Sequence, residues 1–204
     1  MKSIVGGSLL AALLVAVLSA FSLSLGARNW GLLGDSRLVN DANGDLVVEF
    51  PLSGSINYLY TTKGPRVLSG TVSYAVRVTV QGMPVFRYDT EPWNTCISPA
   101  TARPYFGTPF KGNASKIAFT NRWWSNPVAF VLQEGEASAT IPLDPALWSD
   151  VHGQSGTQNP AQFDADRSNV GQIGVTFGGG CFFGHGVYVQ DGRAWFTLVD
   201  VSVN

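Results

Sequence analysis

GQIGVTF (171–177), GGG (178–180), CFFGHGVYV (181–189) and AWFTLVDVSV (194–203) form the stretch that decides the fold. The three apolar runs have the length and the β-branched and aromatic content of strands, and glycines separate them. Between the last two runs lies Gln190-Asp191-Gly192-Arg193, and an Asp-Gly pair in this position is a strong signal for a two-residue hairpin turn. The stretch therefore predicts antiparallel strands of a β-sandwich.

A turn at Asp191-Gly192 would also fix the register of the hairpin, with Tyr188 opposite Trp195. One face would then carry Val187, Val189, Ala194, Phe196 and Leu198, and the other Tyr188, Trp195, Thr197, Val199, Val201 and Val203. Apolar residues on both faces favour a central position in the sheet. We interpret the Tyr188/Trp195 pair as a stabilising cross-strand contact; the alternative is that the pair lines a groove.

The first 27 residues are predicted to be separate from the folded domain. Lys2 precedes an uncharged run from Ile4 to Leu25, and Ala20-Phe21-Ser22 offers a small-x-small cleavage site. The run is also long enough to remain as a membrane anchor if it is not cut. We expect residues 1–27 to be a signal peptide or an N-terminal anchor, and residues 28–204 to form one β-sandwich domain that is secreted or periplasmic.

The composition of the chain excludes some classes of binding partner for this domain. Charged residues make up 13% of the chain and the net charge is -1, which excludes a basic surface for nucleic acid or anionic lipid. We expect a monomer that meets a membrane only through an uncut leader. In an exported domain the two cysteines, Cys96 and Cys181, are expected to form a disulfide. The alternative, a Cys181 nucleophile beside His185, is disfavoured because an oxidising compartment would pair the thiol.

Alternating residues predict further strands along the chain. The clearest is 70–80, with Val72, Tyr74, Val76, Val78 and Val80 on one face. Gln81-Gly82 is expected to end this strand, and 84–88 to return as the next one. Asp144 is expected to cap a short helix that begins at Pro145. The other candidate strands are 46–50, 116–120, 128–132 and 137–141, and the segments 89–113 and 121–127 are interpreted as loops.

An excess of aromatic residues falls in or beside these predicted loops. Aromatic rings on loops suit stacking against the apolar faces of sugar rings, with Arg, Asn and Gln side chains supplying hydrogen bonds. The alternative is that each tryptophan closes an end of the core. Because neighbours in a strand point to opposite faces, this alternative is less favoured for Trp123 and Trp124 together than for a single tryptophan. The candidate ligand-binding residues are Trp93, Tyr105, Arg122, Trp123, Trp124 and Trp148.

No recognisable catalytic signature is present in the sequence. It contains no G-x-S-x-G elbow, H-E-x-x-H motif or P-loop. His152 has Asp150 and Ser155 nearby in sequence, and acidic residues for a glycosidase exist without a signature around them. We therefore predict a protein that is not an enzyme.

Several segments resemble the galactose-binding-like jelly rolls found in carbohydrate-binding modules of bacterial secreted proteins. They are IPLDPALWSDVHG (141–153), Phe163, VGQIGVTFGGG (170–180), GHG (184–186) and AWFTL (194–198). The resemblance implies an all-β antiparallel jelly-roll sandwich and a non-catalytic role in binding a polysaccharide or glycan. In many such modules an acidic residue of the last strand holds a structural Ca²⁺ ion, and Asp200 matches that residue.

The sequence thus predicts an exported module that binds carbohydrate without processing it. Two alternatives stay open. One is a structural or adhesive cell-envelope protein with no small-molecule ligand, and the other is a small secreted hydrolase that would use His152 or His185.

Overall fold

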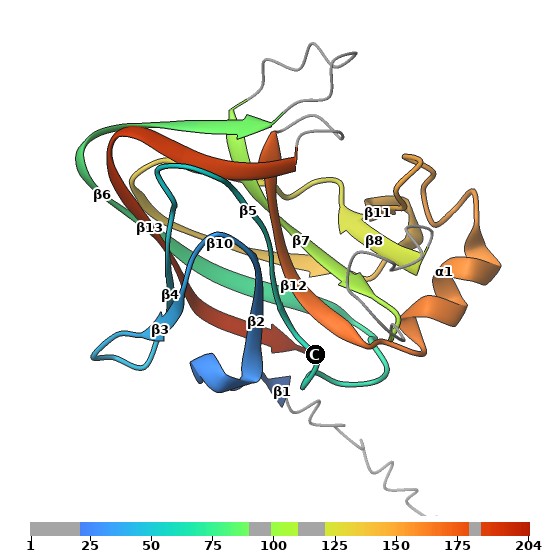
Figure 1. Cartoon of the computed structure of the whole chain (residues 1–204). Helices are drawn as coiled ribbons and strands as arrows, with labels where there is room; N and C mark the ends of the chain where they lie inside the picture. Colours follow the sequence, from blue (N-terminus) through green and yellow to red (C-terminus); the bar gives the residue numbers. More distant parts are fainter. Residues whose placement is uncertain (1–20, 90–98, 110–120, 180–184) are drawn as a thin grey trace, which may run out of the picture.

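The computed structural model describes residues 21–89, 99–109, 121–179 and 185–204 (Figure 1). They form an antiparallel jelly-roll β-sandwich with one short α-helix, which confirms the predicted fold class. The elements in chain order are β1 (Phe21–Ser22), η1 (Ala27–Asn29), β2 (Trp30–Gly34), β3 (Leu38–Asn40), β4 (Leu46–Glu49), β5 (Ile56–Thr61), β6 (Thr71–Asp89), β7 (Ala100–Gly107), β8 (Arg122–Ser125), β9 (Phe130–Val131), β10 (Gly135–Pro142), η4 (Pro145–Leu147), β11 (Trp148–Ser149), α1 (Pro160–Arg167), β12 (Gln172–Gly179) and β13 (His185–Val203).

Two long strands, β6 and β13, pair with each other along their whole length, from Val72 opposite Val203 to Asp89 opposite His185. Both strands bend at the same place, where Gly82 lies opposite Gly192 (Figure 1). Gly82 has φ +83° and Asp191 has φ +60°, and the register shifts between Gln190 and Gly192. A bulge of this kind bends a strand pair, so the pair passes from one layer of the sandwich to the other.

The predicted hairpin at Asp191-Gly192 is therefore wrong. The two runs on either side of it are halves of one strand, and each half pairs with β6; Tyr188 lies opposite Arg87 and Trp195 opposite Thr79. The predicted end of the strand at Gln81-Gly82 is wrong for the same reason. Both turn signals mark positions where the backbone needs positive φ, and here that backbone forms a corner instead of a reversal.

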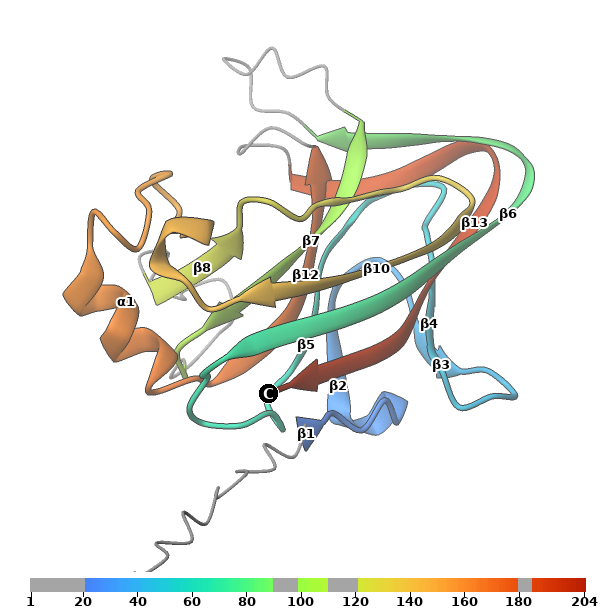
Figure 2. The same ribbon diagram turned by 180° about the vertical axis from the view of Figure 1, so that it is seen from behind.

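The corner divides the sheet into two layers. In the first layer, β10 pairs with residues 71–80 of β6, which pair with residues 194–203 of β13, and β4, β3 and β1 follow. In the second layer, the remaining halves of β6 and β13 are followed by β5, β12, β7, β8 and β11, while β2 pairs with β5 and β9 with β7. Figure 2 shows β10 and β6 of the first layer from the opposite side.

The core lies between the layers and is built from alternate residues of their strands. Phe177 of β12 meets Phe196 of β13 edge to face, with ring centroids 5.1 Å apart, and Phe50 packs against Phe177 at 5.6 Å. The side chains of Val187, Val189, Ala194, Phe196 and Leu198 are fully buried, as expected for one shared face. A fully buried Val, Leu or Phe side chain contributes about 1.5–3 kcal/mol to folding.

An aromatic cluster closes the core at the end of the sandwich covered by α1. Phe163 of α1 packs against Trp123 at 5.0 Å and against Phe106 at 5.9 Å, and Phe106 packs against Trp148 at 5.2 Å. Helix α1 is not among the elements predicted from the sequence, although Pro160 occupies its first turn, where no amide hydrogen is needed. The predicted cap at Asp144 is confirmed: its carboxylate accepts a hydrogen bond from the Ala146 amide.

The described chain already joins the sheet before residue 28. Phe21 lies opposite Val203 in an antiparallel pair, and Leu23 is buried in the core. Residues 1–20 lie outside the described residues, so the leader remains a prediction. Within the described part of the chain, no helix combines the length and the apolar character needed to cross a bilayer.

Two segments interpreted as loops are strands of the second layer, namely β7 and β8. The sequence of β7 misleads because Pro104 falls inside it, and a proline donates no hydrogen bond to a neighbouring strand. On one side β7 pairs with β9 through Thr101 and Ala102, and with β8 from Tyr105 to Gly107. Pro104 falls in the gap between these partners. The predicted strands at 46–50 and 137–141 are present as β4 and β10, that at 128–132 is reduced to β9, and 116–120 lies outside the described residues.

Candidate carbohydrate-binding face

The candidate site lies on the side of the second layer that faces away from the core. Tyr60, Gly174, Tyr105 and Trp124 are consecutive partners across β5, β12, β7 and β8, so they form one row. Tyr58, Thr176 and Arg103 form the adjacent row. We call this surface the aromatic face, and it consists of Tyr58, Tyr60, Arg103, Tyr105, Arg122 and Trp124.

Strand alternation places these side chains together. The intervening residues Leu59, Val175 and Phe106 point into the core and are fully buried, so their neighbours along each strand must point outward. Gly174 lies between Tyr60 and Tyr105 in the row and has no side chain to separate them. Gly31 of β2, on the other side of Tyr60, leaves space in the same way, since a Cβ atom there would lie 2.7 Å from the Tyr60 ring.

The rings of the aromatic face are in mutual contact. Tyr105 meets Tyr58 edge to face, with ring centroids 5.4 Å apart, and stacks on Trp124 with centroids 6.4 Å apart and an interplanar angle of 25°. Aromatic pairs in these geometries contribute about 0.5–1.5 kcal/mol beyond the area that they bury. The contacts hold three rings from three strands in fixed orientations, so the face is organised before any ligand arrives.

Arg122 of β8 binds Tyr58 of β5 and so connects the two outer strands of this face. Its Nη1 donates a 2.8 Å hydrogen bond to the Tyr58 hydroxyl, and its guanidinium carbon lies 5.1 Å from the centroid of the Tyr58 ring. Burial raises the pKa of Tyr58, while the positive charge of Arg122 and its hydrogen bond oppose that rise. Burial likewise raises the pKa of Tyr105 well above its usual value. Both phenols are therefore neutral at physiological pH.

Polar groups accompany the rings. The Tyr105 hydroxyl donates a 3.2 Å hydrogen bond to Oε1 of Gln172, which is buried. Arg103 is half-buried, its Nη1 donates to the Ser125 carbonyl at 3.4 Å, and burial lowers the pKa of its guanidinium. The accessible members of the face are Tyr58, Tyr60 and Arg103, all half-buried. Beside them lie Thr176, also half-buried, and Leu33, whose side chain is exposed.

The structure brings three of the six predicted ligand-binding residues together and separates the others. Tyr105, Arg122 and Trp124 belong to the aromatic face, although they are buried members of strands and not residues of open loops. Trp123 and Trp148 point into the core, where Trp123 Nε1 donates to Asp166 Oδ2 at 2.9 Å. Trp93 lies outside the described residues. The ligand-binding role itself stays a prediction.

Tyr58, Tyr60 and Arg103 are accessible residues of this face that sequence reasoning missed. Tyr58 and Tyr60 belong to INYLYT (56–61), which was not recognised as a strand, although its two tyrosines alternate with the core residue Leu59. That alternation is the signal that would have identified them.

The other predicted site residues receive no support from the described structure. Asp200 accepts hydrogen bonds from Ser22 at 3.4 Å and from Ser202 at 3.3 Å. Within the described ranges, no three His, Cys, Asp or Glu side chains gather where they could hold a metal ion. Cys96 and Cys181 lie outside the described residues, so their disulfide stays a prediction.

The hydrolase alternative requires His152 or His185 beside a carboxylate. His152 is exposed, and the nearby Asp150 carboxylate accepts hydrogen bonds from the backbone amides of His152 and Gln154 at 2.8 and 3.0 Å. That carboxylate therefore shapes a turn. The side chain of His185 is not among those described.

Solved structures similar to this chain include two carbohydrate-binding modules. A family 11 carbohydrate-binding module from Clostridium thermocellum, in complex with a β-1,3-1,4-mixed-linked tetrasaccharide, is 10% identical with a TM-score of 0.47, over 90% of this chain and 94% of that chain. The xylan-binding module CBM15 is 14% identical with a TM-score of 0.39, over 89% of this chain and 97% of that one. No protein-family model and no curated protein matches the sequence. Both similarities concern the path of the chain alone.

Proposed function

We propose that this protein is a non-catalytic module that binds a polysaccharide or glycan on the aromatic face. The observation that carries the proposal is the row of aromatic side chains from β5, β7 and β8, with only Gly174 of β12 between the first two, flanked by two arginines. A sugar ring has an apolar face of C–H groups and a rim of hydroxyls. The rings of Tyr58 and Tyr60 offer the apolar contact, and Arg103 and Thr176 offer hydrogen bonds to hydroxyls.

The buried members of the face have a supporting role in this proposal. Tyr105 packs against Tyr58 and Arg122 binds its hydroxyl, while Trp124 stacks on Tyr105, so together they hold the Tyr58 ring in one orientation. A ring that is already oriented loses little conformational entropy when a ligand binds, which favours affinity. The proposal includes export of the domain, because polysaccharides of cell surfaces lie outside the cytoplasm.

Affinity gel electrophoresis tests the proposal directly. The purified domain would be run through gels that contain mixed-linkage β-glucan, xylan or galactan, beside a Tyr58→Ala/Tyr60→Ala variant. We expect at least one polysaccharide to retard the unaltered domain, and the double variant to migrate as in a gel without polysaccharide. Val67→Ala is the matched control, because Val67 is 57% exposed and lies outside the aromatic face.

A second variant tests whether the position of the Tyr60 ring matters for binding, and not only its presence. Gly31→Ala keeps Tyr60 but places a Cβ atom within 2.7 Å of its ring, which must then move. We expect weaker retardation with an unchanged circular dichroism spectrum. Retardation equal to that of the unaltered domain in both variants would exclude the aromatic face. No retardation by a wide polysaccharide panel would favour the structural or adhesive alternative.

A further inference from the structure

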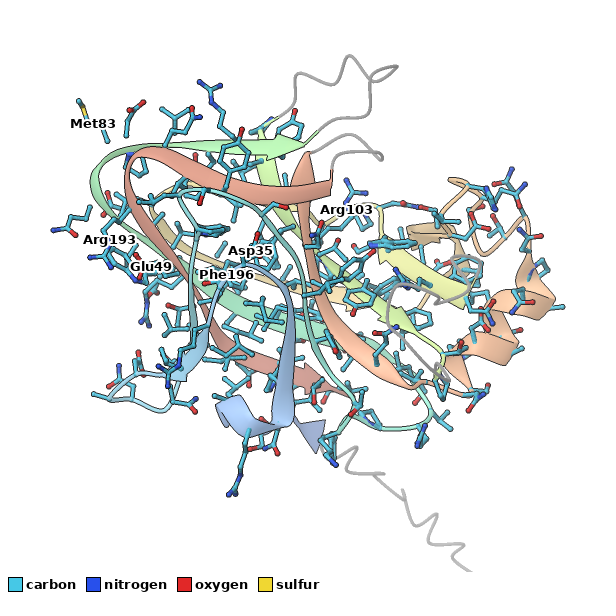
Figure 3. The ribbon with its side chains drawn as sticks, in the orientation of Figure 1. Asp35, Glu49, Met83, Arg103, Arg193 and Phe196 are labelled. Carbon is cyan, nitrogen blue, oxygen red and sulfur yellow. The ribbon has the colours of Figure 1, made fainter. Side chains whose placement is uncertain are left out.

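A pocket of about 370 Å³ lies at the first layer beside the loop that follows β2, away from the aromatic face. Its volume is within the range of pockets that hold small molecules. The residues that give it chemical character are Asp35, Arg37, Val39, Glu49, Leu52 and Trp195. In Figure 3, Glu49 and Arg193 lie close together beside the bent strands, and Arg103 of the aromatic face lies apart from these two.

Hydrogen bonds hold the two walls of this pocket together. Glu49 of β4 and Trp195 of β13 are direct partners across the sheet, so their side chains lie on one face. The opposite wall is the β2–β3 connection, and Ser36 Oγ in that connection donates a hydrogen bond to the Glu49 carbonyl. The Asp35 amide donates to the Ser55 carbonyl at 3.1 Å. The loop is thereby fixed on the sheet.

Ion pairing leaves the pocket nearly neutral. Glu49 accepts a 2.6 Å hydrogen bond from Arg193 Nε, and the Arg193 guanidinium lies 5.0 Å from the centroid of the Trp195 ring. This pair cancels one negative charge at the rim. The remaining charged groups of the lining, Asp35 and Arg37, are of opposite sign. A neutral ligand that both donates and accepts hydrogen bonds fits this balance better than an ion does.

The absence of a side chain at Gly54 leaves the space that the carboxylate of Asp35 occupies. A Cβ atom at that position would lie 1.9 Å from Asp35 Oδ2, and Gly54 has φ +76°, which other residues rarely adopt. The apolar part of the pocket is accessible, since Leu52 is 63% exposed and Val39 is 44% exposed. With the indole of Trp195 they present an apolar surface beside an acceptor and a donor.

We infer that this pocket is a second sugar site, which binds one neutral sugar ring against Trp195 and Leu52, with Asp35 and Arg37 on its hydroxyls. The ligand class follows the proposed function, whereas the site is independent of the aromatic face. Because the two sites belong to different layers of the sandwich, one molecule would bind two chains, or two segments of one chain, and gain avidity from doing so.

Isothermal titration calorimetry with tetrasaccharides of mixed-linkage β-glucan, xylan and galactan tests the inference on the full domain. We expect two binding sites per molecule. Asp35→Asn and Trp195→Ala should each remove one site and leave the other at its original affinity, while Tyr58→Ala/Tyr60→Ala should remove the complementary one. The indole N–H resonance of Trp195, assigned by Trp195→Phe, should shift on addition of the tetrasaccharide to the double tyrosine variant. Val67→Ala is the control.

The possible outcomes distinguish failure of the second site from failure of the aromatic face. One site that the tyrosine double variant abolishes, with a Trp195 resonance that does not move, would overturn the second site and leave the aromatic face intact. One site that depends on Asp35 and Trp195 alone would overturn the aromatic face and retain the pocket. No binding of any tetrasaccharide would overturn both.

Discussion

Arg122 of β8 donates a 2.8 Å hydrogen bond to the hydroxyl of Tyr58 on β5, across the two strands that lie between them. The bond joins distant parts of the second layer and fixes a ring that the proposed ligand would contact. It also gives Arg122, which is buried, a partner for its charge. The first predictions follow from this pair.

Removing the Tyr58 hydroxyl should reduce stability more than binding. Tyr58→Phe deletes the acceptor of the Arg122 bond but keeps the ring. A hydrogen bond to a charged group contributes about 1.5–3 kcal/mol, so we expect a loss of that size in the free energy of unfolding, measured with guanidinium chloride. Polysaccharide retardation should persist. Tyr60→Phe, which removes a hydroxyl two residues away, is the control, and equal losses in both variants would contradict the role of the Arg122 bond.

Stability should fall at alkaline pH. Burial raises the pKa of Tyr58, Tyr74 and Tyr105 in the folded state, whereas an unfolded tyrosine ionises near its usual value of about 10. Above that pH the unfolded chain releases protons that the folded chain retains, so the free energy of unfolding decreases as pH rises. Well below pH 10 the three phenols are neutral in both states and the full stability is present.

Urea unfolding between pH 8 and 11 measures this effect. Each such tyrosine adds a slope of at most about 1.4 kcal/mol per pH unit, so Tyr58→Phe should show a shallower decline than the unaltered domain. A decline of equal slope in the two proteins would show that Tyr58 does not contribute.

Trp123 and Trp124 should respond differently to substitution, although they are neighbours. Trp123 is fully buried and binds Asp166, so Trp123→Ala is expected to cost about 3–5 kcal/mol of unfolding free energy. Trp124→Ala removes the ring that stacks on Tyr105, so we expect weaker polysaccharide binding as well as a smaller loss of stability. Thermal unfolding and affinity electrophoresis of both variants check this. Weaker binding in Trp123→Ala alone would reverse the assignment of the two faces.

The corner of β6 and β13 predicts opposite effects at adjacent residues. Asp191 has φ +60°, which costs a side-chain-bearing residue roughly 1–2 kcal/mol, so Asp191→Gly should be tolerated or slightly stabilising. At Gly192 a Cβ atom would lie 2.7 Å from the Gln81 carbonyl oxygen, so Gly192→Ala should lower the unfolding midpoint. The unfolding midpoints of both variants in guanidinium chloride, compared with that of the unaltered domain, measure these effects. An unchanged midpoint in Gly192→Ala would contradict the described geometry of the corner.

The predicted Cys96–Cys181 disulfide can be examined through the strand ends that flank the two cysteines. Asp89 lies opposite His185 and Ala100 lies opposite Gly179, and β6 and β12 are in contact, so the chain enters and leaves both segments at the same end of the sandwich. We expect no free thiol in the oxidised, denatured protein, and a loss of about 4 kcal/mol on reduction. Two labelled thiols in protein purified from an oxidising compartment would refute the pairing.

The sequence predicts the fold class because alternation survives wherever a strand has one buried face, as in residues 72–80. A strand cannot be recognised by this alternation where both of its faces are buried. β7 and β8 carry Tyr105, Arg122 and Trp124 on a face that is nearly as buried as the core face, so no polar alternation marks them. Pro104 adds a false loop signal.

Local turn signals were ambiguous for another reason. Gly82 and Asp191-Gly192 report that the backbone needs positive φ, but that requirement is the same in a hairpin turn and in a bulge at a corner. Which of the two forms depends on whether a second long strand is available to pair across the bend. That information lies in residues far away in the chain.

The central claim is that sugar binds across the tyrosines of β5. Intermolecular nuclear Overhauser effects between a tetrasaccharide that the domain retains and the aromatic protons of the protein test it most directly. We predict cross-peaks from the C–H protons of the sugar to the rings of Tyr58 and Tyr60, which vanish in the Tyr58→Ala/Tyr60→Ala variant. Cross-peaks to other rings, with none to these two tyrosines, would contradict it.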